Sequence, residues 1–107
     1  MESYNWKQVP RRTTGEGIQL QTVHSGRMTV AQWHFAPDRQ LPEHSHPHEQ
    51  IAMLQEGRFE LTVDGQTREL QPGEIVVIPP DIVHSGHSIT ASRVIDIFSP
   101  VREDLKD

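Results

Sequence analysis

The clearest hydrophobic pattern in the chain lies in residues 58–63, where every second side chain is apolar. A period of two residues predicts a strand with one face buried and the other in water. The dipeptide Asp64-Gly65 follows, and both residue types tolerate the positive φ angles of a tight hairpin turn. Residues 66–70 then return as the second strand of a predicted hairpin.

Runs of β-forming residues predict further strands at 17–23, 28–35, 75–78 and 92–98. The run at 75–78 is continuously apolar, which predicts a strand buried on both faces. Residues 11–15 are interpreted as a loop, and no segment shows a helical period longer than a turn or two. Short strands at a spacing of roughly ten residues, separated by glycine and proline, are typical of an all-β sandwich or barrel.

Length and composition narrow the class of protein. At 107 residues the chain is expected to form a single domain, 1–107, with an N-terminal arm at 1–16 and a C-terminal tail at 99–107. The net charge of −5 and the lack of a basic run argue against nucleic-acid binding. The absence of cysteine excludes disulfides and thiolate metal ligands. Without a signal-peptide pattern or an apolar run of about 20 residues, we expect a cytoplasmic protein with no membrane partner.

Three of the seven histidines lie close together, at His44, His46 and His48. Neutral imidazole is the commonest metal ligand in proteins. Residues two apart on a strand point to the same face, so His44 and His46 can aim at one point as a bidentate clamp. This pair alone is a weak indication, and the case depends on distant residues reaching the same point.

Two spacings around these histidines resemble the paired motifs of the cupin superfamily. The residues that match the first motif are His44, His46, Gln50 and Gly57, and those that match the second are Gly73, Pro79 and His84. The resemblance implies a double-stranded β-helix, or jelly-roll barrel, with the two motifs meeting inside it. It implies four metal ligands: His44, His46, Gln50 and His84. Histidine and amide ligands accept Ni, Zn, Fe, Mn or Co, so the metal cofactor is expected to be a divalent transition metal of open identity.

Three positions depart from the cupin motifs. Asp38 and Asp81 stand where the motifs have glycine, which we expect to alter only turn chemistry. Gln50 replaces the usual glutamate. Because an amide is neutral, the metal would keep its full charge and attract anions more strongly than it would beside a carboxylate ligand.

The C-terminal segment carries the second candidate cluster. By alternation, Asp96 shares a strand face with Val94 and Phe98, and a buried acid between apolar neighbours is costly unless it is paired or functional. Together with the histidine motifs, this segment resembles the pectin-degradation (KdgF-type) cupins. The resemblance implies catalytic roles for Asp96, Phe98 and Arg102, which match the D-x-F-x3-R positions of that family.

The same resemblance implies a metal-dependent isomerase or tautomerase. Its substrate would be a small anionic sugar, a 4,5-unsaturated uronate from pectin or alginate, converted to the linear 5-keto-4-deoxyuronate. It also implies a homodimer, and an apolar strand face at Ile95 and Ile97 is compatible with one. Two other functions stay open: an iron or nickel dioxygenase of the quercetinase or acireductone type, and a non-catalytic cupin that binds a sugar acid.

Each site residue also has a purely structural interpretation. The ligand histidines could lie in surface loops, His48 could replace one of them as a ligand, and Gln50 could hydrogen-bond a ligand instead of binding metal. Among the catalytic candidates, Phe98 could belong to the core. The two charged candidates also have structural alternatives. Asp96 could be satisfied by backbone groups or by Arg93, and Arg102 could pair with Glu103 or Asp104. His24, His34 and His87 have no motif support and are interpreted as ordinary surface or barrel residues.

Overall fold

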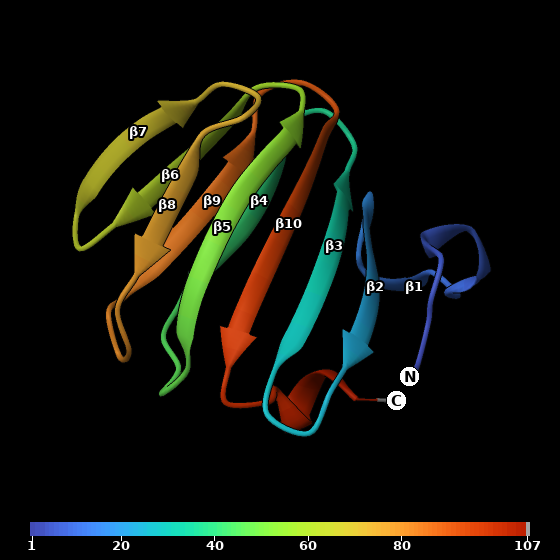
Figure 1. Cartoon of the computed structure of the whole chain (residues 1–107). Coiled ribbons are helices and arrows are strands. Elements are labelled where there is room, and N and C mark those ends of the chain that lie inside the picture. The colour runs from blue at the N-terminus through green and yellow to red at the C-terminus, as the bar shows by residue number, and fades with distance from the viewer. Residues whose placement is uncertain (107) are drawn as a thin grey trace.

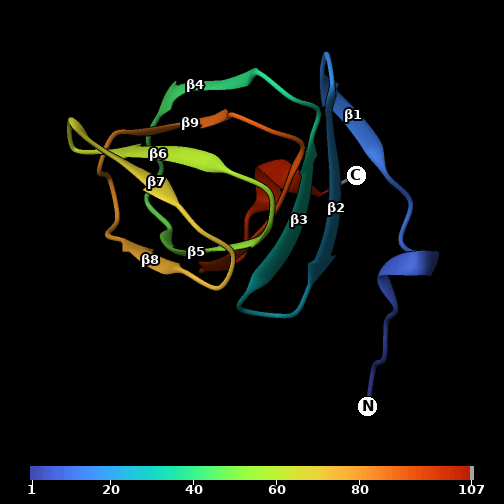
Figure 2. The same cartoon turned by 90° about the horizontal axis from the view of Figure 1, so that it is seen from above.

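The computed structural model describes residues 1–106 and contains two antiparallel sheets curled around one interior (Figures 1 and 2). The strands are β1 (Arg12–Gly15), β2 (Ile18–His24), β3 (Thr29–Phe35), β4 (Arg39–His44), β5 (Glu49–Glu56), β6 (Phe59–Val63), β7 (Gln66–Leu70), β8 (Ile75–Ile78), β9 (His84–Ser88) and β10 (Ser92–Ser99). The larger sheet has the order β1-β2-β3-β10-β5-β8, and the smaller has β4-β9-β6-β7. Helical structure in the described residues is limited to two single 3-10 turns, η1 (Trp6–Gln8) and η2 (Glu103–Leu105). The all-β prediction is confirmed.

The inward faces of both sheets meet in one apolar core. Strand β10 alternates buried and half-buried residues along its length, as the period-two pattern predicts. Phe35 from the larger sheet and Phe59 from the smaller one pack with ring centroids 5.0 Å apart. This core fills the barrel around Phe35 and Phe59, whereas polar side chains such as Gln50, His84 and Asp96 are buried elsewhere in the same interior.

Tight turns connect the strands where the sequence predicts them. Asp64 and Gly65 have φ angles of 50° and 78°, the left-handed values of a two-residue hairpin turn. Asp38 and Asp81 also have positive φ, at 56° and 65°. They therefore keep the backbone conformation for which the cupin motifs have glycine, because aspartate tolerates this region better than most residues do.

Two strand predictions were wrong. Residues 11–15 were expected to be a loop, but four of them form β1, which pairs with β2 at the edge of the larger sheet. Strand β8 was expected to be buried on both faces, yet Ile75 and Val77 are 63% and 59% exposed. The reason is its position, since β8 is an edge strand whose outer face meets solvent. Continuous apolar runs cannot distinguish these two situations.

Prolines hid further strands from the sequence analysis. Strand β4 contains Pro42 and was not predicted, although it is an edge strand, where a missing N–H is tolerated. The pairing of β4 with β9 is irregular between Leu41 and His44, around this proline. Strands β5 and β9, which carry Gln50 and His84, also went unpredicted.

The terminal segments predicted as an arm and a tail both contact the larger sheet. The side-chain amide of Gln21 donates hydrogen bonds to the backbone oxygens of Trp6 and Val9, which holds η1 against β2. In the tail, the backbone N–H of Arg102 donates to Thr29 Oγ1 of β3 at 2.9 Å. The last tail residue, 107, lies outside the described residues. Across residues 1–106, no helix has the length and apolar character needed to cross a membrane.

Candidate metal centre and active site

The structure brings together three of the four predicted metal ligands as a histidine cluster. His44 ends β4, His46 lies in the following loop, and His84 begins β9. One ring nitrogen from each lies within 4.8 Å of the others. His44 and His84 are paired across β4 and β9, with ring centroids 4.2 Å apart. The alternative that all three are surface-loop histidines is therefore wrong, because His44 and His84 lie on strands and only His46 lies in a loop.

The second ring nitrogen of each histidine is held by a backbone carbonyl. Nδ1 of His44 lies 2.8 Å from the oxygen of Pro42, Nδ1 of His84 2.8 Å from that of Ile82, and Nδ1 of His46 3.1 Å from that of His48. A carbonyl can only accept, so Nδ1 carries the proton and donates in all three rings. This arrangement leaves Nε2 with a free lone pair, and it is the usual orientation of a metal-binding histidine.

Gln50, the fourth predicted ligand, points into the same cluster from β5. Its Oε1 lies 3.1 Å from Nε2 of His46, so two acceptor atoms face each other. Nε2 of His84 is buried and has no hydrogen-bond partner. Buried acceptor atoms without a donor require a shared cation or proton donor between them. The donor set therefore fits a divalent transition metal.

The protonation states of the rings agree with this conclusion. Burial lowers the pKa of His46 to about 4, with the Arg102 charge and His84 acting in the same direction. Burial also lowers the pKa of His84. Both imidazoles are therefore neutral near pH 7, as metal ligands must be.

Asp96 lies beside this cluster on the inner face of β10 and is 6% exposed. Burial raises its pKa to about 7, whereas Gln50, Trp33 and Arg102 favour the charged form and act in the opposite direction. Asp96 Oδ1 is buried without a partner that meets hydrogen-bond geometry. The proposed structural pairing with Arg93 is wrong, because Arg93 bonds Gln32 and Glu56 on the outer face.

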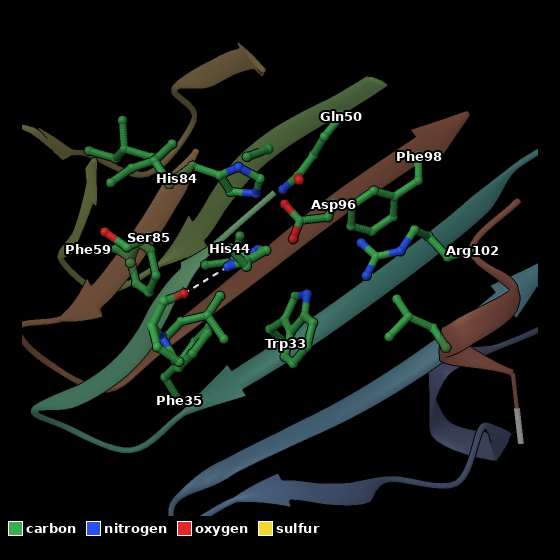
Figure 3. Close-up of a pocket in the computed structure, with 18 residues that line it drawn as sticks. Trp33, Phe35, His44, Gln50, Phe59, His84, Ser85, Asp96, Phe98 and Arg102 are labelled. Atoms are coloured by element: carbon green, nitrogen blue, oxygen red, sulfur yellow. Dashed lines mark hydrogen bonds between the residues drawn. The ribbon is translucent and has the colours of Figure 1, made fainter. Parts of the chain in front are cut away.

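Phe98 and Arg102 form the far side of the site (Figure 3). Phe98 is 2% exposed, and its ring centroid lies 5.6 Å from that of His46. The guanidinium carbon of Arg102 lies 4.6 Å above the Phe98 ring, a cation–π contact. Arg102 also pairs with Asp104, which was one of the structural interpretations of this residue.

The predicted site residues other than His46 line one cavity of about 320 Å³, a size that suits a small ligand. His44, Gln50, His84, Asp96 and Arg102 contribute to its polar end. The remaining lining is largely apolar and includes Trp33, Phe35, Phe59 and Leu105.

Trp33 is the functional candidate that the sequence analysis missed. It lies on β3, directly across from Val94 of β10, and its indole nitrogen points toward Asp96 in Figure 3. That nitrogen is buried without a hydrogen-bond partner. The inward alternation of residues 29, 31, 33 and 35 places Trp33 in the barrel, so this signal was available in the predicted strand.

The remaining histidines lie outside the ligand cluster. The His48 ring centroid is 5.4 Å from that of His46, and its Nδ1 is buried without a partner. His24 bonds Thr29, His34 bonds Gln21, and His87 lies between two carboxylates. Each of these three belongs to the sheets themselves, in agreement with the sequence analysis.

A family model described as the cupin domain matches residues 31–98, a segment that contains all four predicted metal ligands and Asp96. The chain belongs to the cupin family. Its similarity extends beyond the cupin motifs, because the cupin is 31% identical over 101 residues to the pectin degradation protein KdgF of Dickeya dadantii, with 92% of each chain covered.

Solved structures give the same relationship. The cupin superposes on KdgF from Halomonas sp. with a TM-score of 0.94 and 28% identity, covering 99% of both chains. An RmlC-like cupin from Shewanella frigidimarina gives a TM-score of 0.92 and 28% identity, covering 96% of this chain and 94% of the other. The predicted cupin barrel and the resemblance to KdgF-type cupins are confirmed.

Proposed function

We propose that this cupin opens and tautomerises 4,5-unsaturated uronates to the linear 5-keto-4-deoxyuronate. The observation that carries the proposal is the placement of the buried Asp96 carboxyl between a neutral ligand cluster and the Arg102 guanidinium, in one cavity. Similarity to proteins named for pectin degradation supports a uronate as the substrate.

The proposed metal ligands are His44, His46, His84 and Gln50. A divalent metal held there would supply Lewis-acid polarisation of a substrate oxygen and a fixed positive charge for an anion. Because Gln50 is neutral, it does not reduce that charge. The amide also faces Asp96, so it connects the ligand cluster with the proposed proton-transfer group.

Asp96 is the proposed general acid and base. Ring opening breaks the bond between C1 and the ring oxygen, removes the proton of the C1 hydroxyl and leaves an enolate oxygen on C5. Collapse of that enolate to the ketone then requires a proton on C4. One carboxyl can accept the first proton and deliver the second, which is isomerisation without net gain or loss of atoms. Such catalysis typically contributes about 10²–10⁴-fold to the rate.

Arg102 and Phe98 are proposed to bind the sugar. A guanidinium forms a bidentate pair with a carboxylate, which supplies both energy and orientation. The Phe98 ring offers an apolar surface for the hydrogen-bearing face of the sugar. Trp33 completes the site through its buried indole N–H, which points toward the Asp96 carboxyl (Figure 3).

The test is to incubate metal-loaded protein with lyase-generated unsaturated galacturonate and follow the loss of the C4=C5 ultraviolet absorbance. The metal content of the protein is verified beforehand. We expect acceleration over buffer, and its absence would contradict the proposed reaction. Binding of the uronate without turnover would support a non-catalytic sugar-acid-binding cupin.

The second candidate is a quercetinase-type dioxygenase. The apolar lining around Phe35, Phe59 and Leu61 favours it, since a flavonol has much more apolar surface than a uronate. Oxygen consumption with a flavonol would support this candidate. The homodimer, the cytoplasmic location and the absence of nucleic-acid and membrane partners also stay predictions.

A further inference from the structure

We propose that Asp104 is a positioning residue that fixes the Arg102 guanidinium, so that the remaining N–H groups of Arg102 face the cavity and bind the carboxylate of the substrate. The inference rests on the proposed function, because it takes the ligand to be a uronate. It adds a residue of η2, outside both cupin motifs, to the substrate-binding machinery.

The contact between the two residues is bidentate. Nε of Arg102 donates to Asp104 Oδ1 at 2.9 Å, and Nη2 donates to Oδ2 at 2.7 Å. This pairing uses one edge of the planar guanidinium and so defines the direction of the other edge. The Arg102 hydrogen bond also lowers the pKa of Asp104 to about 2, so the pair is charged at any pH near neutrality.

The environments of the two side chains differ. The Arg102 side chain is 12% exposed and lines the cavity, whereas the Asp104 side chain is 61% exposed and lies outside the lining. Asp104 is therefore placed to hold the arginine from the solvent side without occupying the substrate's space. Among the described residues, Nη1 of Arg102 has no hydrogen-bond partner.

The plane of the guanidinium is also fixed on one face. Arg102 stacks on Phe98, and Leu105, the next residue after Asp104, lines the same cavity. The backbone of this segment is anchored as well, because the N–H of Arg102 donates to Thr29 of β3. The guanidinium is therefore preorganised by stacking, by its backbone anchor and by Asp104. A preorganised guanidinium loses less conformational entropy when it binds an anion, which favours binding.

A matched control lies in the same turn. Glu103 is an exposed acid that pairs with Lys106 at 3.1 Å and is not part of the cavity lining. Glu103→Gln removes one negative charge from η2, as Asp104→Asn does, but leaves Arg102 untouched. Comparing the two variants separates positioning from a general change in charge.

The experiment measures kcat and KM for unsaturated galacturonate, and by calorimetry the Kd for saturated galacturonate, with metal-loaded protein. For Asp104→Asn we expect KM and Kd to rise by about tenfold, with kcat within about twofold. The lost contact orients the guanidinium that binds the substrate carboxylate. Glu103→Gln should change all three by less than about twofold. In an Arg102→Ala background, Asp104→Asn should have no further effect, because Asp104 acts through the arginine.

Several outcomes would overturn the inference. Tighter uronate binding by Asp104→Asn would mean that Asp104 competes with the substrate for Arg102. An equal loss in the Arg102→Ala background would indicate a structural role for η2. If the wild-type protein binds galacturonate without turning over the unsaturated sugar, the proposed reaction fails while the Kd comparison still tests Asp104. If it does neither, both proposals fall.

Discussion

Burial raises the pKa of Asp96 to about 7, while Gln50, Trp33 and Arg102 act in the opposite direction. Near neutral pH its carboxyl is therefore present in both the protonated and the charged form. Replacement by asparagine removes the proton-transfer group and preserves side-chain volume. We expect Asp96→Asn to lower kcat by about 10²–10⁴-fold. Metal content should be unchanged, because Asp96 is not among the proposed ligands. Parallel measurement of turnover and bound metal checks this, and normal turnover by the variant would remove the acid/base role.

Gln50 determines the charge of the proposed metal centre. Gln50→Glu would add a carboxylate to the ligand set and place it next to Asp96. The variant should bind metal at least as well as the wild type, yet its kcat/KM for an anionic uronate should fall by about tenfold, because the centre loses positive charge. Elemental analysis and the absorbance assay measure the two effects. Increased kcat/KM would show that the neutral amide is not adapted to an anionic substrate.

At the residue level, spacing predicted the ligands better than it predicted their surroundings. His44, His46, Gln50 and His84 converge as the motif resemblance implied. Trp33 and Asp104 were not assigned functional roles. The alternation along β3 already placed Trp33 inside the barrel, but its nearness to Asp96 depends on the register between β3 and β10. The contact of Asp104 with Arg102 depends on the path of η2, and a linear pattern contains neither of these.

At the level of elements, the proposed metal ligands join the two sheets. His44 and His84 belong to strands of the smaller sheet, whereas Gln50 belongs to β5 of the larger one. A ligand that binds only the folded state stabilises it, by about 2.7 kcal/mol at a hundredfold excess over Kd. We expect Ni²⁺ to raise Tm by roughly 10 °C or more in a chain of this size.

Two histidine variants make this test specific. His84→Ala should abolish the metal-induced shift in Tm, because it removes a nitrogen from the cluster. His87→Gln, three residues along the same strand β9, should retain the shift, because His87 bonds Asp38 and Glu60 instead. Thermal unfolding with and without metal measures both. A full shift in His84→Ala would place the metal elsewhere.

His87 itself connects three segments of the smaller sheet. Its Nε2 lies 2.8 Å from Asp38, just before β4, and its Nδ1 lies 3.0 Å from Glu60 of β6. Hydrogen bonds to Asp38 and then to Glu60 raise the pKa of His87 above its ordinary value of 6.5. The resulting stabilisation is therefore fully present below pH 6.5 and is lost as pH rises through the raised pKa.

We accordingly expect the urea midpoint of unfolding to be higher for wild type than for His87→Gln at pH 6, and the two midpoints to be equal by pH 9. Because these groups lie near the surface, high salt should reduce the difference at pH 6. Urea denaturation at both pH values checks the prediction. A difference that persists at pH 9 would assign the effect to packing of the imidazole ring.

Strand prediction succeeded where one face is buried and the other is in water, as in β6 and β10. For β8 the strand was predicted correctly but its burial was not, because an apolar run does not reveal whether a strand lies at a sheet edge. Strand prediction failed for β4, since Pro42 weakens the pattern although an edge strand accommodates it. Whether a strand lies at the edge or in the centre of a sheet depends on how the strands assemble, so the sequence indicates it only indirectly.

At the level of the whole molecule, the outer face of the larger sheet carries an apolar row. Strand register places Val30, Ile97, Ile51 and Val77 side by side across β3, β10, β5 and β8. In the predicted homodimer, this face of one copy would pack against the same face of the other, because a two-fold interface uses the same surface on both copies. The Arg93–Glu56 pair on the same strands provides polar groups beside the row.

Val77→Lys tests the homodimer with little effect on the fold, because Val77 is 59% exposed. Placing like charges in a two-fold interface brings them opposite each other, so the variant should sediment as a monomer while wild type sediments as a dimer. Val83→Lys is the control, since Val83 is 49% exposed but precedes β9 and lies outside the larger sheet. Sedimentation velocity over a range of concentrations measures all three proteins. A monomeric wild type would show the homodimer prediction to be wrong, and a dimeric Val77→Lys would place the interface on another surface.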